Sequence, residues 1–382
     1  MKKLLIVHNF YKEFGGEDAN IHEEIKFFKK EYEVSFFFEK NKYSLSIFNV
    51  LSFIFFSNPT TNNKFIDFLD DFEPDVVYIH NTWFKINLGI FTILKKRKIK
   101  VLLKIHNFRY DCGRHFFAKK HLKNNVRCHA CGFNKPYLFI LNRYYQESYI
   151  KSFILYLYSL KYFSILLKHE VTLLAISQFH KQKLIEFGIN EERIQVFNNP
   201  VVFRDYPTVK KNNSVIYAGR ISKEKGVEEL ITSWLKSNLS DHTLYIIGEG
   251  ELKNFLEKKY QKNIGINFLG YLPNNQVLEL ISKAKAVVTA TKLYEGQPRL
   301  LCEASSLGTL SIYPSFGGMD EFFPEGYKYS FEQFNYDELS RVLNLLQDDK
   351  LQQEAVKKSQ DHIYSKLNEE KIYNDFSELI GK

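Results

Sequence analysis

Cysteine is scarce in this sequence, and no hydrophobic run is long enough to cross a membrane. The 382 residues include 4 Cys, too few for a disulfide-stabilised scaffold in a chain of this length. The longest apolar stretch, residues 44–57, is shorter than the ~18 residues that a membrane-spanning helix needs. The apolar run after Met1 is also too short for a signal peptide and predicts a β-strand instead. We therefore expect a cytoplasmic protein.

Two motifs of common nucleotide-dependent enzymes are missing. No G-x-G-x-x-G follows the first strand of either half of the chain, which disfavours an enzyme that uses nicotinamide or flavin. No D-x-D-type pair follows a predicted strand, which disfavours a reaction that depends on a divalent metal ion. The sequence also contains no repeat or low-complexity segment beyond two halves of similar pattern.

Aromatic and basic residues are plentiful. The chain contains 35 Phe and 24 Tyr, and its 53 Lys and Arg against 44 Asp and Glu give a formal net charge of +9. A basic balance favours anionic partners, such as nucleotide phosphates, nucleic acid or anionic lipid. The length favours two domains over one compact core.

Short apolar runs alternate with helical patterns, which is typical of parallel α/β sheets. The predicted strands are residues 3–8, 33–38, 75–80, 100–106 and 171–177 in the first half, and 215–219, 243–248, 266–270 and 286–291 in the second. We predict a Rossmann-like domain over residues 1–197, a linker over 198–213, a second Rossmann-like domain over 214–360, and a C-terminal helix over 361–382 that packs back on the first domain. Such sheets bind ligands at the carboxyl ends of their strands, so we expect a cleft between the domains.

The segment Leu293–Ala304, LYEGQPRLLCEA, places two carboxylates on either side of a predicted helix start. Pro298 suits the first helical position, and Gly308 suits the end of the helix. Glu295 then lies in the loop before the helix, and Glu303 lies roughly 7.5 Å along it from Pro298. Backbone N–H groups at this helix start favour a phosphate. Taken alone, the pair is equally compatible with ordinary solvated glutamates.

Five segments together narrow the interpretation. They are HNFYKEFGGEDAN (8–20), YAGRISKEKGVEELI (217–231), LYIIGEGEL (244–252), FLGYLPNNQVLELISKAKAVV (268–288) and YEGQPRLLCEA (294–304). This set resembles the retaining, metal-independent nucleotide-sugar glycosyltransferases with the GT-B fold, and more narrowly the bacterial branch called glycosyltransferase family four. The resemblance implies an α/β fold of two Rossmann-like domains that face a central cleft, with the donor bound by the second domain.

The activity that this resemblance implies is transfer of a hexose-type sugar from a UDP- or GDP-linked donor. The implied acceptor is a glycan or a lipid-linked saccharide in the synthesis of a surface polysaccharide, such as capsule or O-antigen. No cofactor is implied for catalysis. A phosphorylase or a sugar-nucleotide epimerase on the same fold is an alternative. A non-enzymatic protein that binds nucleic acid is another, although the lysines are scattered rather than clustered.

The resemblance also assigns residues. Glu303 matches the glutamate that binds the ribose hydroxyls, and Glu295 the one that faces the transferred sugar. Arg220 and Lys225 match the basic pair on the diphosphate, where fixed cations stabilise the leaving group. His106, at a strand end, matches the histidine that approaches the donor sugar. The implied catalytic set is His106, Glu295, Arg220 and Lys225. The implied donor-binding set is Gly15, Gly16, Arg220, Lys225, Gly270, Tyr271, Glu295, Gly296, Gln297, Pro298, Arg299, Leu300 and Glu303.

Weaker candidates accompany these. His8 and His80 also end strands, but each is more often a structural histidine, so we rank them below His106. The segment FGGMDEFF (316–323) resembles a Gly-Gly-x-x-Glu loop with Glu321 at the glutamate position, although Asp320 departs from the commoner proline. We expect the side chains of Lys225 and Glu303 to be exposed in the cleft.

Cys112, Cys128 and Cys131 lie close together in sequence, with histidines nearby. The two-residue spacing of the last two suits a structural zinc ion, with a histidine as a further ligand. The alternative is a set of reduced thiols in a loop. We expect Cys302 to lie in the core.

Residues 137–170 form a long aromatic and basic stretch that is compatible with a helix. Together with residues 44–57, it could dock on an anionic membrane where a lipid-linked acceptor lies. Packing of the helix within the N-terminal domain is an equally good interpretation.

Overall fold

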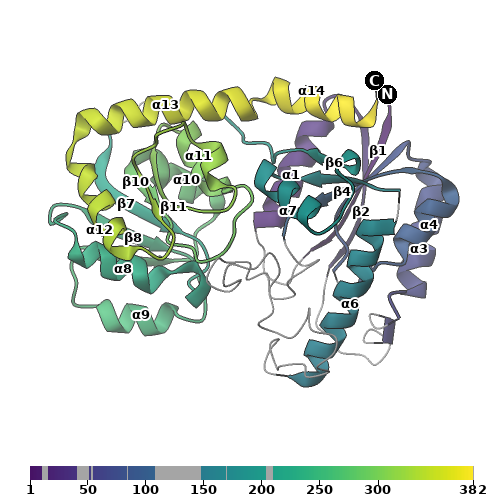
Figure 1. Cartoon of the computed structure of the whole chain (residues 1–382), viewed down its shortest axis with the longest axis horizontal. Helices are drawn as coiled ribbons and strands as arrows, with labels where there is room; N and C mark the ends of the chain where they lie inside the picture. Colours follow the sequence, from purple (N-terminus) through teal and green to yellow (C-terminus); the bar gives the residue numbers. More distant parts are fainter. Residues whose placement is uncertain are drawn as a thin grey trace. The chain divides into compact units, whose positions relative to one another are not determined.

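The computed structural model describes residues 1–10, 16–40, 51–52, 55–83, 85–107, 148–168, 170–203 and 210–381 (Figure 1). The chain divides into two compact units, Met1–Pro200 with Asp375–Lys382, and Val201–Asn374. The first strand of the second unit begins at Asn212, inside the segment predicted as a linker. No helix in the described residues is long and apolar enough to span a membrane.

The first unit is built on a six-stranded parallel sheet. Its strands are β1 (Lys3–Phe10), β2 (Glu33–Lys40), β3 (Val76–Asn81), β4 (Lys100–Ile105), β5 (Thr172–Ala175) and β6 (Ile194–Val196). Their order is β2-β1-β3-β4-β5-β6, so the winding direction reverses between β1 and β3. All five strands predicted in this half are confirmed, whereas β6 was missed.

The helices of the first unit are α1 (Gly16–Phe28), α3 (Pro59–Phe72), α4 (Ile90–Arg97), α6 (Tyr149–Lys168) and α7 (Gln178–Glu186), with a short 3₁₀ turn η2 (Glu191–Arg193). The start of α3 shows how local sequence sets an element. Asn58 caps α3 by accepting from the backbone N–H of Thr61 at 3.2 Å, and Pro59 occupies the first turn.

The last helix of the chain, α14 (Glu369–Ile380), ends on the first unit. The ring of Phe376 lies 4.1 Å from that of Phe28 on α1 and 5.5 Å from that of Tyr78 on β3. Lys2 Nζ donates to the carbonyl of Ile380 at 3.3 Å. The two chain ends therefore lie side by side (Figure 1).

The second unit has its own six-stranded parallel sheet. Its strands are β7 (Asn212–Ala218), β8 (Thr243–Ile247), β9 (Ile266–Gly270), β10 (Ala284–Val288), β11 (Leu310–Ser315) and β12 (Ser330–Glu332). Their order is β12-β11-β10-β7-β8-β9, the doubly wound order of dinucleotide-binding folds. Ligands of such sheets bind where the winding reverses, which here is between the carboxyl ends of β7 and β10.

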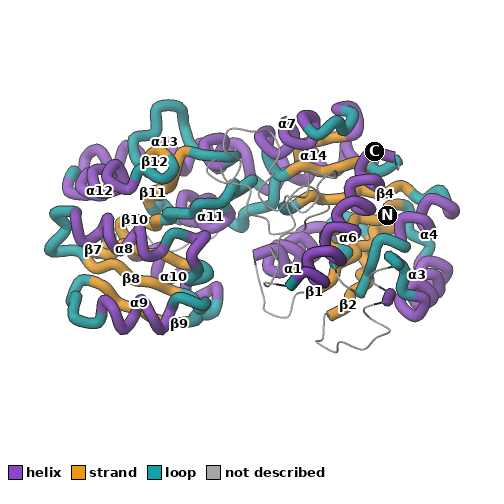
Figure 2. Tube along the Cα trace, turned by 60° about the horizontal axis from the view of Figure 1, so that its bottom comes forward, coloured by secondary structure: helices purple, strands orange, loops and turns teal. Residues whose placement is uncertain are grey.

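Helices cover both faces of this sheet (Figure 2). They are α8 (Val227–Lys236), α9 (Lys253–Tyr260), α10 (Asn274–Lys283), α11 (Arg299–Ser306), α12 (Tyr336–Asn344) and α13 (Asp349–Leu367), with 3₁₀ turns η3 (Lys223–Lys225), η4 (Met319–Phe322) and η5 (Leu345–Gln347). The apolar faces of α8 and α12 bury Trp234 and Leu339 against Val215 and Ile312 of the sheet.

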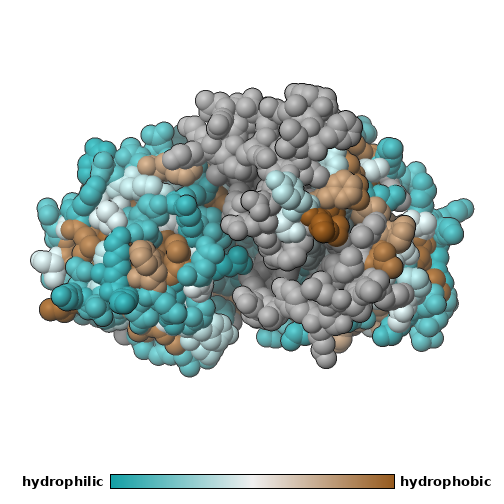
Figure 3. All heavy atoms as spheres, turned by 90° about the horizontal axis from the view of Figure 1, so that it is seen from below, coloured by the Kyte–Doolittle hydropathy of each residue, from teal (hydrophilic) through white to brown (hydrophobic). Residues whose placement is uncertain are grey.

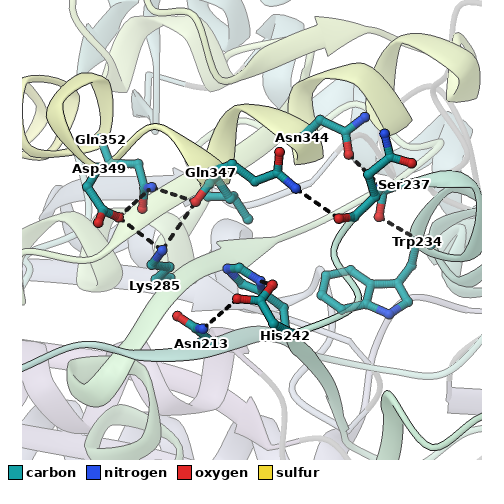
Figure 4. Close-up of polar contacts among 12 residues, drawn as sticks. Asn213, Trp234, Ser237, His242, Lys285, Asn344, Gln347, Asp349 and Gln352 are labelled. Atoms are coloured by element: carbon teal, nitrogen blue, oxygen red, sulfur yellow. Dashed lines mark hydrogen bonds and ion pairs between the residues drawn. The ribbon is translucent and has the colours of Figure 1, made fainter.

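A polar network fixes the amino-terminal end of β10 to the start of α13 (Figure 4). Lys285 Nζ donates to Leu346 O at 3.2 Å and to Asp349 Oδ1 at 3.0 Å. Gln347 Nε2 donates to Asn238 O at 2.8 Å and ties η5 to the segment after α8. These contacts lie at the opposite end of the strands from the loops that hold the predicted site residues, so we assign them a structural role.

Candidate functional site

The loops that follow β7 and β10 are locked together at the point where the winding reverses. The backbone N–H of Lys292 donates to Glu224 O at 2.9 Å. Gly226 has a φ of +67°, and a Cβ at this position would overlap the carbonyl oxygen of Ala290. Only glycine combines that backbone conformation with so close an approach. The fold therefore brings the GRISKEKG and LYEGQP segments into direct contact.

Lys225 and Glu295 form an ion pair across these two loops. Lys225 Nζ lies 2.6 Å from Glu295 Oε1, and the two side chains are 29% and 28% exposed. Thr291 Oγ1 donates to the same carboxylate oxygen at 3.4 Å. An ammonium group has three N–H donors, so its bond to Glu295 leaves capacity for a phosphate. The structure thus joins two of the predicted catalytic residues.

Arg220 lies on the same loop as Lys225 but is far more exposed. Its side chain is 71% exposed, and Nη1 lies 3.9 Å from a carboxylate oxygen of Glu224. The backbone at this position is held firmly, because Tyr217 Oη donates to Arg220 O at 2.7 Å. The guanidinium group is therefore placed on a fixed loop and extends into solvent.

Glu303 and Arg299 form the second ion pair of the site, along one face of α11. Arg299 Nε donates to Glu303 Oε1 at 2.8 Å, with the two side chains 18% and 11% exposed. Our expectation that Glu303 is exposed was therefore wrong. A buried carboxylate is unfavourable without a partner, and Arg299 supplies one. The helix begins at Arg299 with Pro298 as its N-cap, one residue later than predicted.

The other predicted residues of the LYEGQPRLLCEA segment lie just before α11 or in its first turn. Gly296, Gln297 and Pro298 are buried, whereas Leu300 is partly exposed. Cys302 is fully buried, as expected, and burial raises the pKa of its thiol. It therefore belongs to the core of the unit.

The segment after β11 supports the Glu295 loop from another side. The backbone N–H of Gly318 donates to Glu295 O at 2.8 Å, and Gly317 has a φ of +74° against the same residue. The rings of Tyr294 and Phe316 stack with centroids 4.1 Å apart. The predicted Gly-Gly loop therefore positions the backbone of Glu295. Asp320 Oδ2 accepts from Ser315 Oγ at 2.7 Å, which closes this turn.

Glycines at three neighbouring strand ends bring the rest of the loops together. Gly270 has a φ of +67° and accepts at its carbonyl from the backbone N–H of Gly248 at 2.8 Å. A Cβ on Gly248 would overlap the carbonyl of Gly219. The N–H of Tyr271, a member of the predicted donor-binding set, donates to Glu249 Oε1 at 3.2 Å. Our sequence reasoning missed Gly219 and Gly248, although a glycine as the last residue of each predicted strand was the available signal.

In the first unit, the three candidate histidines lie at the carboxyl ends of three neighbouring strands, β1, β3 and β4. His106 follows β4, and its Nε2 lies 3.0 Å from Nδ1 of His80 on β3. The rings of His8 on β1 and His80 are 6.4 Å apart between centroids. Burial lowers the pKa of His80 and of His106 well below the ordinary range of histidine, and neighbouring positive charge acts in the same direction.

Other predicted residues are not described. Gly16 begins α1, but Gly15, Cys112, Cys128 and Cys131 lie outside the described residues. Within the described part of the chain, no group of three His, Cys, Asp or Glu side chains could hold a metal ion. The zinc hypothesis for the three cysteines therefore stays a prediction.

The sequence is similar to known glycosyltransferases. Residues 199–362 match the family described as glycosyl transferases group 1. The chain is 30% identical over 164 residues to an uncharacterized glycosyltransferase, MJ1607, of Methanocaldococcus jannaschii, which covers 41% of this chain and 42% of that protein. The chain spans about half the length of the curated relatives that it matches.

Solved structures match over the whole chain. Alr3699/HepE of Anabaena in complex with UDP-glucose has a TM-score of 0.69 at 15% identity and covers 100% of this chain and 99% of its own. WaaG, a glycosyltransferase involved in lipopolysaccharide biosynthesis, has a TM-score of 0.69 at 12% identity and covers 99% and 100%. The chain therefore has the two-domain, Rossmann-like GT-B fold, and its second unit carries a region that matches the glycosyl transferases group 1 family.

Proposed function

We propose that this protein is a glycosyltransferase that moves a hexose-type sugar from a nucleotide-sugar donor to a saccharide acceptor. One observation carries the proposal. The ion pairs Lys225–Glu295 and Arg299–Glu303 gather beside the winding reversal of the second sheet, where such folds bind nucleotides. The region that matches glycosyl transferases group 1 contains all four residues.

The proposed division of labour follows from the chemistry of each group. Lys225 and Arg220 neutralise the negative charge that develops on the departing diphosphate. Glu303 accepts hydrogen bonds from the ribose hydroxyls, because a carboxylate accepts through both of its oxygens and Arg299 occupies one position. Glu295 faces the sugar. A protein of the same fold was crystallised with UDP-glucose, so a UDP-sugar is the first donor to test.

The proposal is tested by a thermal-shift screen against UDP-, GDP- and dTDP-sugars. A ligand that binds only the folded protein raises its apparent stability, by about 2.7 kcal/mol at a hundredfold excess over Kd. We expect one nucleotide class to raise the Tm of the wild type and to raise that of Glu303→Ala much less. Glu257→Ala, an exposed glutamate on α9 of the same unit, is the matched control and should respond as the wild type does. No response to any of the donors would refute the proposal.

We further propose that transfer retains the anomeric configuration of the donor and needs no divalent metal, as in glycosyltransferase family four. The fixed cations Arg220 and Lys225 supply the countercharge that a metal ion would otherwise provide. NMR of the product should show the donor's anomeric configuration, and EDTA should leave turnover unchanged. Inversion would contradict the assignment. Loss of activity in EDTA would also contradict it, provided that substitution of Cys128 and Cys131 does not reproduce the loss.

The proposed acceptor is a lipid-linked saccharide of surface-polysaccharide synthesis, met at the cytoplasmic face of the membrane. One face of α6 supports this choice. Tyr149, Phe153, Leu160 and Leu167 recur at helical spacing and are all exposed. Seen from below, hydrophobic residues are scattered over the described surface of both units (Figure 3). An exposed helix face that is apolar suits the headgroup boundary of a bilayer.

Flotation with vesicles tests the membrane contact. Exposed Lys161 and Lys168 flank this apolar face, and each cation near an anionic surface contributes about 1 kcal/mol. We expect partial flotation with anionic vesicles at low salt and strong loss of it in Lys161→Glu/Lys168→Glu. Lys262→Glu/Lys350→Glu makes the same charge change at exposed lysines of the second unit and should float as the wild type does. If the wild type stays in the soluble fraction, we would withdraw the membrane contact.

A further inference from the structure

Four polar side chains lie in a row in the first unit, in the order Lys104, Glu24, His80 and His106. Lys104 Nζ on β4 donates to Glu24 Oε1 on α1 at 2.5 Å. The other oxygen of Glu24 lies 3.3 Å from His80 Nε2, and His80 Nδ1 lies 3.0 Å from His106 Nε2. Lys104, Glu24 and His80 are at most 5% exposed, whereas His106 is partly exposed. The row therefore leads from the interior to the carboxyl end of β4.

Glu24 acts as an anion in this row because it pairs with a buried lysine. Burial lowers the pKa of Lys104, and the neighbouring carboxylate opposes that effect. The Lys104 ammonium also lies 4.6 Å from the centroid of the Phe197 ring, which stabilises a cation. Ionised Glu24 has no proton to donate, so its second oxygen can only accept.

The charge of Glu24 determines where the neighbouring imidazole protons lie. Burial keeps His80 and His106 neutral by lowering the pKa of each ring, and a neutral imidazole has one N–H and one lone pair. Glu24 Oε2 and His80 Nε2 lie 3.3 Å apart without forming a hydrogen bond, but a carboxylate at that distance still favours an N–H over a lone pair on His80 Nε2 by electrostatic attraction. His80 Nδ1 is then the acceptor, and His106 Nε2 must be the donor.

We propose that Glu24, acting through His80, is a positioning residue that keeps the proton of His106 on Nε2 and so presents Nδ1 as a hydrogen-bond acceptor. The inference rests on the proposed function in one respect, which is that the donor to Nδ1 is a sugar hydroxyl. A bare ring nitrogen accepts from a hydroxyl, whereas an N–H in its place could only donate to the hydroxyl oxygen. The row of side chains therefore fixes the direction of the hydrogen bond that His106 makes to a hydroxyl at the end of β4.

A purely structural ion pair makes a different prediction. Lys104 and Glu24 would satisfy each other without any effect on the histidines. His106 would then keep its tautomer when the ion pair is replaced by neutral side chains.

The position of the His106 proton distinguishes the two cases. It can be read from the ¹⁵N shifts of the ring nitrogens in full-length protein labelled at histidine, with His106→Asn used to assign the signals. In the wild type we expect N–H at Nε2 and a bare Nδ1. In Glu24→Gln/Lys104→Met, the form protonated at Nδ1 should become populated. His80→Phe, which removes the acceptor but keeps a ring of similar size, should change the signals in the same direction.

Turnover gives a second measurement. In both variants we expect kcat to fall about tenfold, the equivalent of one hydrogen bond. Lys285→Met/Asp349→Asn removes an ion pair of the second unit and should leave the His106 signals unchanged. The inference is overturned if the wild-type proton lies on Nδ1, or if His106 keeps one tautomer in both variants. If the wild type has the expected tautomer but transfers no sugar, the proposed function fails and the role of Glu24 stands.

Discussion

Replacing Lys225 by alanine should lower kcat/KM for the nucleotide-sugar by about 10²–10³-fold, the usual effect of removing one fixed group that stabilises transition-state charge. The fold should survive, because a partly exposed ion pair contributes only about 0–1 kcal/mol to stability. Lys225 is 29% exposed and its partner Glu295 is 28% exposed. Steady-state kinetics and urea unfolding of the purified variant measure the two effects separately.

The affinity for free UDP shows whether Lys225 contacts the diphosphate or serves only as a structural partner of Glu295. If Lys225 binds the diphosphate, Lys225→Ala should weaken UDP affinity. Glu295→Gln should leave UDP affinity nearly unchanged and lower turnover, because we place Glu295 at the sugar. Lys292→Ala is the control, since Lys292 lies on the partner loop and pairs with Glu229. Unchanged affinity of Lys225→Ala for UDP would remove Lys225 from the donor site.

The strand pattern of the chain was largely predictable. All nine strands named from apolar runs are present, with ends shifted by up to three residues. The three strands missed have local causes. β6 and β12 are three residues each, too short to show a pattern, and β11 contains Pro314, which argues against a strand in a sequence. Tertiary pairing with β10 and β12 on either side makes a strand there regardless.

The motifs of the site could be predicted from the sequence, but the contacts between their residues could not. The spacing of Glu295 and Glu303 indicated a loop and a helix, and the structure has both. Nothing in that spacing could show that Lys225, 70 residues earlier, bonds Glu295. That contact depends on β10 returning to pair with β7, which is a property of the whole sheet. The burial of Glu303 has the same kind of cause, because Arg299 provides the partner that permits it.

The sequence contained one sign of the contacts that lead from Glu24 to His106, and we did not use it. Lys104 lies inside the apolar strand KVLLKI, where every residue after the first is buried. A lysine in such a place needs a carboxylate partner, so the sequence implied a buried acid elsewhere. It could not identify Glu24, because Glu24 and Lys104 are 80 positions apart in the sequence and meet only through the order of the strands. The same order brings His80 beside His106.

Replacing Gly226 by alanine should severely damage the site. A left-handed backbone costs a non-glycine residue about 1–2 kcal/mol, and crowding of the Ala290 carbonyl should raise the loss to about 3 kcal/mol or more. For a unit of this size, each 1 kcal/mol lowers the Tm by about 2–4 °C. We therefore expect a fall of about 6–12 °C, together with lost donor binding as the loops after β7 and β10 separate. Gly326→Ala is the matched control, because Gly326 has a similar φ of +72° but no atom within 4 Å of an added Cβ. Equal losses in the two variants would show that backbone conformation, rather than the contact between the two loops, makes Gly226 necessary.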